Sequence, residues 1–268
     1  MSRTFLATLH YDGTGFVGWQ RQPAGRSVQV EFERVLERLF ERRTVAHASG
    51  RTDAGVHALG IGVSFEAPAQ WDAPDLRRSV NALLPRECWV ESVHVMRPGF
   101  HARKSALSRR YRYDVGLDDG AASPFRRPFE WALCRPLDVA ALDDAATRLL
   151  GAHDFSAFAA KGTPRPHYRC TLTRSEWTVR PEGRGVSFHV EADRFLHHMV
   201  RFMVGTMVDI GAGRRPVDDI ERLLASGDNQ ETSPPAPPQG LYFVAASYPA
   251  DLYAESSDEE AHALAPGR

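Results

Sequence analysis

The chain has 268 residues, of which 43% are hydrophobic, enough to bury the core of one large domain or two ordinary ones. No run reaches the roughly 18 apolar residues of a membrane span, and the first residues lead straight into a strand pattern, so we expect no membrane helix and no signal peptide. Three widely spaced cysteines without CxxC spacing, Cys88, Cys134 and Cys170, indicate reduced thiols and a cytoplasmic protein. The composition therefore excludes membrane and disulfide-rich secreted proteins.

The net charge of −1 is unevenly distributed along the chain. Residues 250–268 contain five acidic residues and one arginine, so the preceding body is basic. Lysine occurs only at Lys104 and Lys161, so 31 of the 33 basic residues are arginine. Arginine binds phosphate bidentately and stacks on bases, although a biased genomic base composition would also raise its content.

The first half of the chain alternates between strand and helix patterns. Residues 5–11 predict a strand, and residues 28–40 predict an amphipathic helix capped by Ser27. The pattern continues with a strand near 45–46, a loop at 50–58, a strand at 60–65, a helix from Asp72 or Pro74 to 84, and a strand at 89–95. This order predicts an α+β half with helices on one face of an antiparallel or mixed sheet.

The second half repeats this pattern. The expected elements are a strand at 111–115, a helix at 138–150, a hairpin of 172–179 and 186–190, a helix at 196–210 and a last strand at 241–246. We therefore expect two similar halves, residues 1–104 and 105–249, that form one continuous, mainly antiparallel sheet with helices on one side and a basic central cleft. Residues 250–268 lack apolar periodicity and predict a disordered acidic tail.

A glycine-rich stretch follows the first strand, with glycines at Gly13, Gly15 and Gly18. The spacing matches G-x-G-x-x-G, but no helix opens directly after it, because residues 19–25 intervene with Pro and Gly. We therefore expect no nucleotide cofactor, and interpret the stretch as a connection that carries Trp19 and Gln20 toward a ligand.

The loop at residues 50–58 holds the first candidate catalytic group. Asp53 lies between Gly50 and Gly55, which suit a tight turn, and Arg51 would keep the carboxylate ionised. An ionised carboxylate can act as a nucleophile or a base. The alternative is an ordinary turn whose aspartate caps its own backbone.

Basic and aromatic residues alternate in two segments, 100–113 and 161–169. Such a mixture suits single-stranded or looped RNA, which presents phosphates and splayed bases together. In the strand at 111–115, Tyr111 and Tyr113 share one face, opposite Arg112. A solvated charged strand face is the alternative for either cluster alone.

Arg201 lies in an otherwise apolar helical pattern, where a guanidinium is costly unless it is paired. Asp53 is the expected partner, and a side chain that reaches solvent from the helix edge is the alternative. His197 and His198 are adjacent and are expected on different sides of the helix, so we predict no metal site.

These residues resemble the signature of the TruA-type tRNA pseudouridine synthases over nearly the whole chain up to Pro249. The similar stretches are Tyr11–Thr14, Gly18–Gln20, Gly50–Ala58, Asn81–Pro85, Phe100–Arg103, Arg110–Tyr113, His153–Ser156, Met199–Arg201, Val204–Gly205 and Gly240–Tyr242. Lys104 departs from the pattern, since an aromatic residue is common there, and the acidic tail lies outside it.

The resemblance implies a homodimeric isomerase, without metal or organic cofactor, that converts uridine to pseudouridine in the anticodon arm of tRNA (tRNA positions 38–40). It implies that Asp53 is the nucleophile, that Tyr111 stacks on the base and assists proton transfer, that Arg201 pairs with Asp53, and that Arg51 supports the flipped nucleotide. The RNA-binding residues would be Phe100, His101, Ala102, Arg103, Lys104, Arg109, Arg110, Lys161, Arg165 and Leu241. Two alternatives are a catalytically silent tRNA-binding protein or RNA chaperone of the same fold, and a nucleotide-cofactor enzyme that uses Gly13–Gly18.

Overall fold

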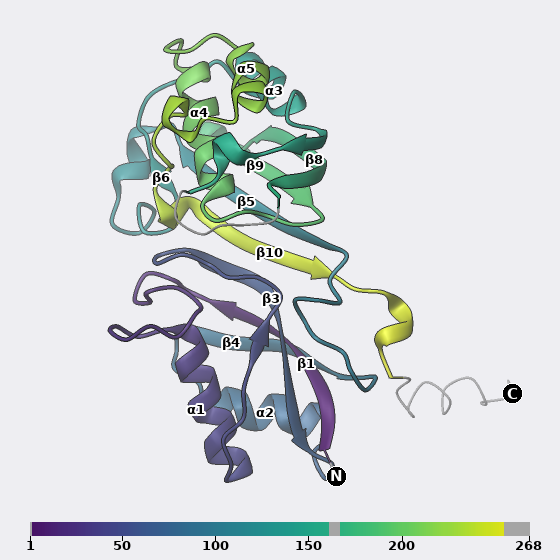
Figure 1. The fold of residues 1–268 in the computed structure, drawn as a ribbon. Helices are drawn as coiled ribbons and strands as arrows, with labels where there is room; N and C mark the ends of the chain where they lie inside the picture. The colour runs from purple at the N-terminus through teal and green to yellow at the C-terminus, as the bar shows by residue number, and fades with distance from the viewer. Residues whose placement is uncertain (1, 161–166, 255–268) are drawn as a thin grey trace, which may run out of the picture.

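A single sheet of ten strands organises the chain in the computed structural model, which describes residues 2–160 and 167–254. The strand order is β4-β1-β3-β10-β5-β9-β8-β7, with β2 on β3 and β6 on β5. The strands are β1 (Ser2–Tyr11), β2 (His47–Ala48), β3 (His57–Pro68), β4 (Cys88–Met96), β5 (Ser108–Gly116), β6 (Trp131–Ala132), β7 (Gly151–Asp154), β8 (Arg169–Val179), β9 (Gly185–Ala192) and β10 (Leu241–Ser247). The helices are α1 (Val28–Phe40), α2 (Ala73–Leu83), α3 (Val139–Thr147), α4 (Met199–Gly211) and α5 (Asp219–Ser226). Figure 1 shows the two groups of strands, with β10 between them.

The last strand joins the two halves of the sheet. β10 pairs with β5 along most of its length, and its residues Tyr242 and Phe243 pair in parallel with His57 and Ala58 of β3. The other strand pairs are antiparallel except β5 with β6. The predicted mainly antiparallel α+β sheet is therefore confirmed.

One face of this sheet carries the core. Alternate residues point to the same side, and the register aligns Phe5 with Phe65, Tyr113 with Phe188, and Phe243 with Tyr111. These side chains belong to one buried cluster that also contains the apolar faces of α1 to α4. The helices therefore cover one face, as expected, while a smaller buried cluster with Leu6 and Phe100 lies apart from it.

The helix ends show which of the predicted capping residues and helix boundaries are present in the structure. Asp72 accepts a hydrogen bond from the Asp75 amide at the start of α2, and Asp138 caps α3 in the same way. Ser27 makes no side-chain cap on α1, so that prediction is wrong although the helix bounds are correct. α4 begins at Met199 rather than at residue 196, because His198 has a left-handed backbone with φ 61°.

The glycine-rich stretch lies under the loop that contains Asp53. An added Cβ on Gly13 would lie 2.1 Å from the Val56 carbonyl oxygen, and one on Gly18 (φ 99°) would lie 2.4 Å from that of Thr52. The Trp19 amide donates to the Thr52 carbonyl oxygen, and the Trp19 side chain is buried in the core. The expectation that Trp19 points to a ligand is therefore wrong, because the glycines serve the close approach of two backbones.

Within the described residues no helix is long and apolar enough to cross a membrane. Two predicted RNA-binding residues, Lys161 and Arg165, lie outside the described residues, as does most of the acidic tail (255–268).

Candidate active site

Asp53 lies in the loop between β2 and β3, at the junction of the two halves of the sheet. Gly55 has a positive φ of 77°, as expected for a tight turn, but Gly50 does not. Gly50 is needed for space instead, because an added Cβ would lie 3.0 Å from the Phe243 ring. The Thr52 hydroxyl is 2.7 Å from the Tyr11 hydroxyl, which anchors the loop to β1.

The carboxylate of Asp53 faces the start of α4. Arg201 Nη1 lies 3.1 Å from Asp53 Oδ2, and Arg201 Nε donates to the Ala236 carbonyl oxygen at 2.7 Å. The Arg201 side chain is 13% exposed, so it does not extend to solvent. Arg51 is exposed and has no ion pair among the described residues, so Arg201 rather than Arg51 is the guanidinium in contact with Asp53.

His197 and His198 also face Asp53, which corrects the expectation that they lie on different sides of a helix. His198 Nε2 is 3.3 Å from Asp53 Oδ2, and His197 Nε2 is 3.6 Å from Oδ1. The two residues precede α4, and the left-handed turn at His198 brings their rings to a centroid distance of 3.9 Å. Burial lowers the pKa of His198 and outweighs the attraction of the Asp53 charge, which favours the neutral imidazole.

These three side chains could in principle bind a metal ion. Their ligand atoms lie within 4.8 Å of one another, and one carboxylate with two imidazoles is a donor set that suits Zn²⁺. The Arg201 guanidinium, however, already binds Oδ2 of the same carboxylate, and its positive charge would repel the ion.

Tyr111 lies beneath this loop. Its side chain is buried and makes edge contacts with Phe195 and Phe243 at centroid distances of 4.9 and 5.0 Å. Burial raises the pKa of Tyr111, and the charge of Asp53 raises it further. The hydroxyl therefore keeps its proton at neutral pH and can act as a hydrogen-bond donor.

The expected RNA-binding residues fall into three groups. Arg103, Lys104 and Arg110 are exposed, and His101 is half-buried. Phe100, Ala102 and Leu241 are buried, so they support the surface rather than form it. Arg109 uses its guanidinium on the carbonyl oxygens of Ser49, Arg103, Ala106 and Asp193, so it holds the protein together at this point.

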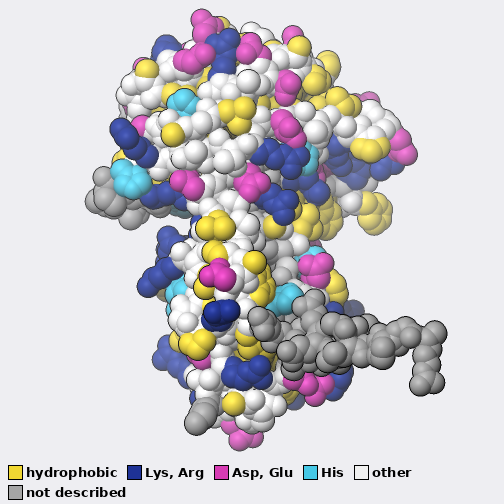
Figure 2. Space-filling view, turned by 90° about the vertical axis from the view of Figure 1, so that its right-hand side faces the viewer, with side chains coloured by type: hydrophobic (Ala, Val, Ile, Leu, Met, Phe, Trp, Pro, Cys, Tyr) yellow, Lys and Arg dark blue, Asp and Glu magenta, His cyan; other side chains and the backbone are white. Residues whose placement is uncertain are grey.

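Basic side chains lie beside the junction of the halves (Figure 2). Figure 2 shows a constriction between an upper and a lower lobe, with Lys and Arg side chains along the underside of the upper lobe. A polyanion placed against this constriction would be close to positive charge on that side.

His57 connects the Asp53 loop to the rest of the fold, and sequence reasoning assigned it no role. The Gly13 amide donates to His57 Nδ1 at 3.1 Å, and Nε2 is 3.1 Å from the Pro128 carbonyl oxygen. The imidazole stacks on Tyr242 at 5.0 Å. Its position four residues after Asp53, at the start of a strand, was the available signal.

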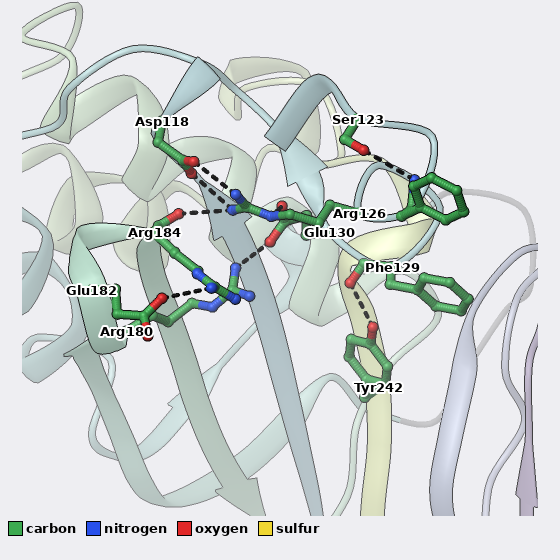
Figure 3. A network of polar contacts seen from close by, with 10 residues as sticks. Asp118, Ser123, Arg126, Phe129, Glu130, Arg180, Glu182, Arg184 and Tyr242 are labelled. Atoms are coloured by element: carbon green, nitrogen blue, oxygen red, sulfur yellow. Dashed lines mark hydrogen bonds and ion pairs between the residues drawn. The ribbon is translucent and has the colours of Figure 1, made fainter. Parts of the chain in front are cut away.

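Ion pairs fix the loop whose Pro128 carbonyl oxygen contacts His57. Figure 3 shows Arg126 between Asp118 and Glu130, and Arg180 on the other oxygen of Glu130. Glu130 is buried, so two guanidinium groups neutralise its charge. The Tyr242 hydroxyl donates to the Phe129 carbonyl oxygen at 2.5 Å. The backbone beside His57 is therefore held in place from two directions.

We expect His57 to make folding stability depend on pH. Burial lowers the pKa of His57 from its usual 6.5 and outweighs the attraction of Asp12. Below pH 6.5 the unfolded chain therefore binds a proton at His57 more readily than the folded chain does. The contribution of His57 to the free energy of unfolding is thus fully present above pH 6.5 and is lost as the pH falls. His57→Asn keeps an acceptor for Gly13 and does not titrate, so its unfolding free energy should fall less than that of the wild type between about pH 7.5 and 5.5. Urea titrations at both pH values measure this, and equal losses would contradict it.

The fold corresponds to the pseudouridine synthase class, and a family model described as tRNA pseudouridine synthase matches residues 145–249. The chain is 42% identical over 241 residues to the tRNA pseudouridine synthase A of Myxococcus xanthus, covering 90% of each chain. It is 38% identical to the proteins of the same name from Geobacter sp. (strain M21), over 92% of this chain and 99% of the relative, and from Streptococcus pneumoniae (strain Taiwan19F-14), over 91% and 98%. The chain belongs to the tRNA pseudouridine synthase A family.

Proposed function

We propose that this protein isomerises uridine to pseudouridine in the anticodon arm of tRNA, at the positions its family modifies. The observation that carries the proposal is the contact of Arg201, from the C-terminal half, with Asp53 in the N-terminal half. The Arg201 guanidinium places a positive charge beside the carboxylate that would act on the substrate. Membership of the family supplies the substrate class.

The chemistry needs few groups. The target uridine leaves its stack and enters the site, at a cost of a few kcal/mol. The N1–C1′ bond breaks, the uracil rotates, C5 bonds to C1′, and the proton on C5 leaves while N1 gains one, so no oxidant or reductant takes part. Asp53 would attack C1′, add to C6 or remove the 2′ proton, and all three routes use the ionised carboxylate.

The other residues would hold the substrate. Tyr111, beneath the loop, would contact the detached base and donate a hydrogen bond. Arg51, exposed and without an ion pair among the described residues, would support the flipped nucleotide. Arg103, Lys104 and Arg110 would bind phosphates, as exposed cations do in RNA-binding proteins.

Tritium release tests the proposal. With tRNA carrying [5-³H]uridine, the wild type should release tritium and form pseudouridine at positions 38–40. A purified protein that binds tRNA without release would instead favour the silent RNA-binding alternative. Bound nicotinamide or flavin in the purified protein would favour the nucleotide-cofactor alternative.

Chelation gives a separate prediction for the Asp53–His197–His198 cluster. We expect activity after EDTA treatment and gel filtration to equal that of the untreated enzyme, because Arg201 already neutralises the carboxylate. Added Zn²⁺ should inhibit if it displaces Arg201, and His198→Asn should weaken that inhibition. Loss of activity with EDTA that Zn²⁺ restores would show that the metal is required.

We also propose a cytoplasmic homodimer whose chains each contain two units, residues 1–104 and 105–249. Light scattering of the purified protein at micromolar concentration tests the assembly, and a monomer mass would refute it.

A further inference from the structure

A polar depression lies on the N-terminal half, away from Asp53. It has a volume of about 520 Å³, within the range of about 300–1,000 Å³ typical of ligand sites. Its walls come from the start of β1, the segment between α1 and β2, the middle of β3 and the loop after β4. Of these segments, only the loop after β4 contains residues that the sequence predicts to bind RNA.

The lining of this depression is mainly positively charged. Arg42, Arg43 and Lys104 line it, are exposed, and have no ion pair among the residues that the structure describes. Glu66 is the acidic group in the wall, and it accepts a hydrogen bond from the Thr4 hydroxyl at 2.5 Å. By contrast, Arg126, Arg148 and Arg222 each contact two carboxylates. The lining therefore contains three cationic side chains and one carboxylate, which gives the depression a net positive charge.

Two imidazoles add hydrogen-bond donors. His47 and His101 stack with a centroid distance of 4.6 Å. The Arg103 amide donates to His101 Nδ1 at 3.1 Å, so the neutral ring carries its proton on Nε2. Burial lowers the pKa of His101, and repulsion by His47, Lys104 and Arg103 lowers it further, which reflects the local positive potential.

The loop that carries His101 and Lys104 is held in place before any ligand binds. The Ala102 amide donates to the Ser64 hydroxyl at 3.0 Å, and Ala102 and Phe100 are buried. Arg109 Nη2 donates to the Arg103 carbonyl oxygen at 2.5 Å. An anion that binds here therefore meets positioned donors and does not have to order the loop.

We propose that this depression binds backbone phosphate of the substrate RNA, several nucleotides away from the uridine at Asp53. His47, in its wall, precedes Asp53 by six residues, and six extended residues span at most about 22 Å. A strand or stem of one RNA molecule can bridge that distance and contact both sites, whereas a free mononucleotide is too short to contact both. The inference rests on the proposed function only for the identity of the RNA.

Charge reversal with a matched control tests the proposal. In Arg42→Glu/Arg43→Glu, both positions are exposed and unpaired, so the fold should persist. In the control Arg78→Glu/Arg135→Glu, the charge change is the same, and its two positions lie outside the lining of the depression. The control also removes the ion pair of Arg78 with Asp75, which is exposed and therefore contributes little to stability. The measurement is the Kd of each protein for an unmodified tRNA transcript, at several salt concentrations between about 50 and 200 mM.

We expect the Arg42/Arg43 variant to bind tRNA at least about tenfold more weakly, with a salt dependence of log Kd that is shallower by about 0.7 for each phosphate that the variant no longer neutralises. The control should stay within about twofold of the wild type, because only non-specific attraction changes. Equal affinities of the two variants would overturn the proposal. Absence of tritium release from wild type that binds tRNA would refute the proposed function instead, because the comparison of Kd values does not depend on turnover.

Discussion

Asp53→Asn is expected to lower kcat for pseudouridine formation by at least about 10³-fold, the order of loss seen when a nucleophile or essential base is removed. The amide has the shape of the carboxylate but cannot attack carbon or accept a proton at neutral pH. Arg201 would retain its hydrogen bond to the Ala236 carbonyl oxygen, so the site should stay assembled. Single-turnover tritium release with excess enzyme measures the loss directly.

The control for this variant is tRNA binding. Asp53 touches Arg201 and the two histidines, not the phosphate-binding depression, so Kd for tRNA should change by less than about threefold. Asp53→Asn with wild-type turnover would exclude Asp53 as the catalytic residue. Comparable losses of binding and turnover would indicate a folding defect.

The second large effect is expected at Arg201. Arg201→Met removes the cation from Asp53 but keeps an unbranched side chain in the largely buried position, which is 13% exposed. Loss of one preorganised charge contact lowers kcat by about 10²–10³-fold in other enzymes, and we expect a similar loss here. Arg201→Lys should recover part of it, because an ammonium is a point charge and cannot donate to Asp53 and the Ala236 carbonyl oxygen with the same geometry.

A double-mutant comparison separates this electrostatic role from a purely structural one. If Arg201 acts through Asp53, Asp53→Asn/Arg201→Met should be no slower than Asp53→Asn alone. Thermal unfolding of Arg201→Met gives the change in stability, which should be about 1–3 kcal/mol for an unpaired, partly buried carboxylate. Additive losses in kcat would mean that the two residues act independently.

Local patterns in the sequence were sufficient for most elements. The apolar spacing of residues 28–40 predicts α1 with its observed bounds, and alternation around Gly183 predicts the β8–β9 hairpin. These elements depend on side chains close together in the sequence. The buried guanidinium at Arg201 also pointed to a carboxylate partner, because an unpaired charge in an apolar helix is costly.

Other features depend on contacts between distant segments. The glycines at 13 and 18 satisfy a cofactor motif formally, yet their small size serves the Asp53 loop, which no local pattern reveals. Helical periodicity also extends α4 too far, because nothing in the sequence near His198 marks its left-handed turn. The histidine pair at Asp53 follows from that single backbone angle and could not be predicted by spacing.

The place of β10 has a consequence for synthesis of the protein on the ribosome. The strand that bridges β3 and β5 is made last of the ten, so a nascent chain that stops before residue 241 leaves most of one edge of β5 and the start of β3 unpaired at the centre of the sheet. Such edges attract other chains, and contacts this far apart in sequence form slowly. Catalytic competence should therefore arise only near the end of translation, and premature termination should yield aggregates rather than a smaller working enzyme.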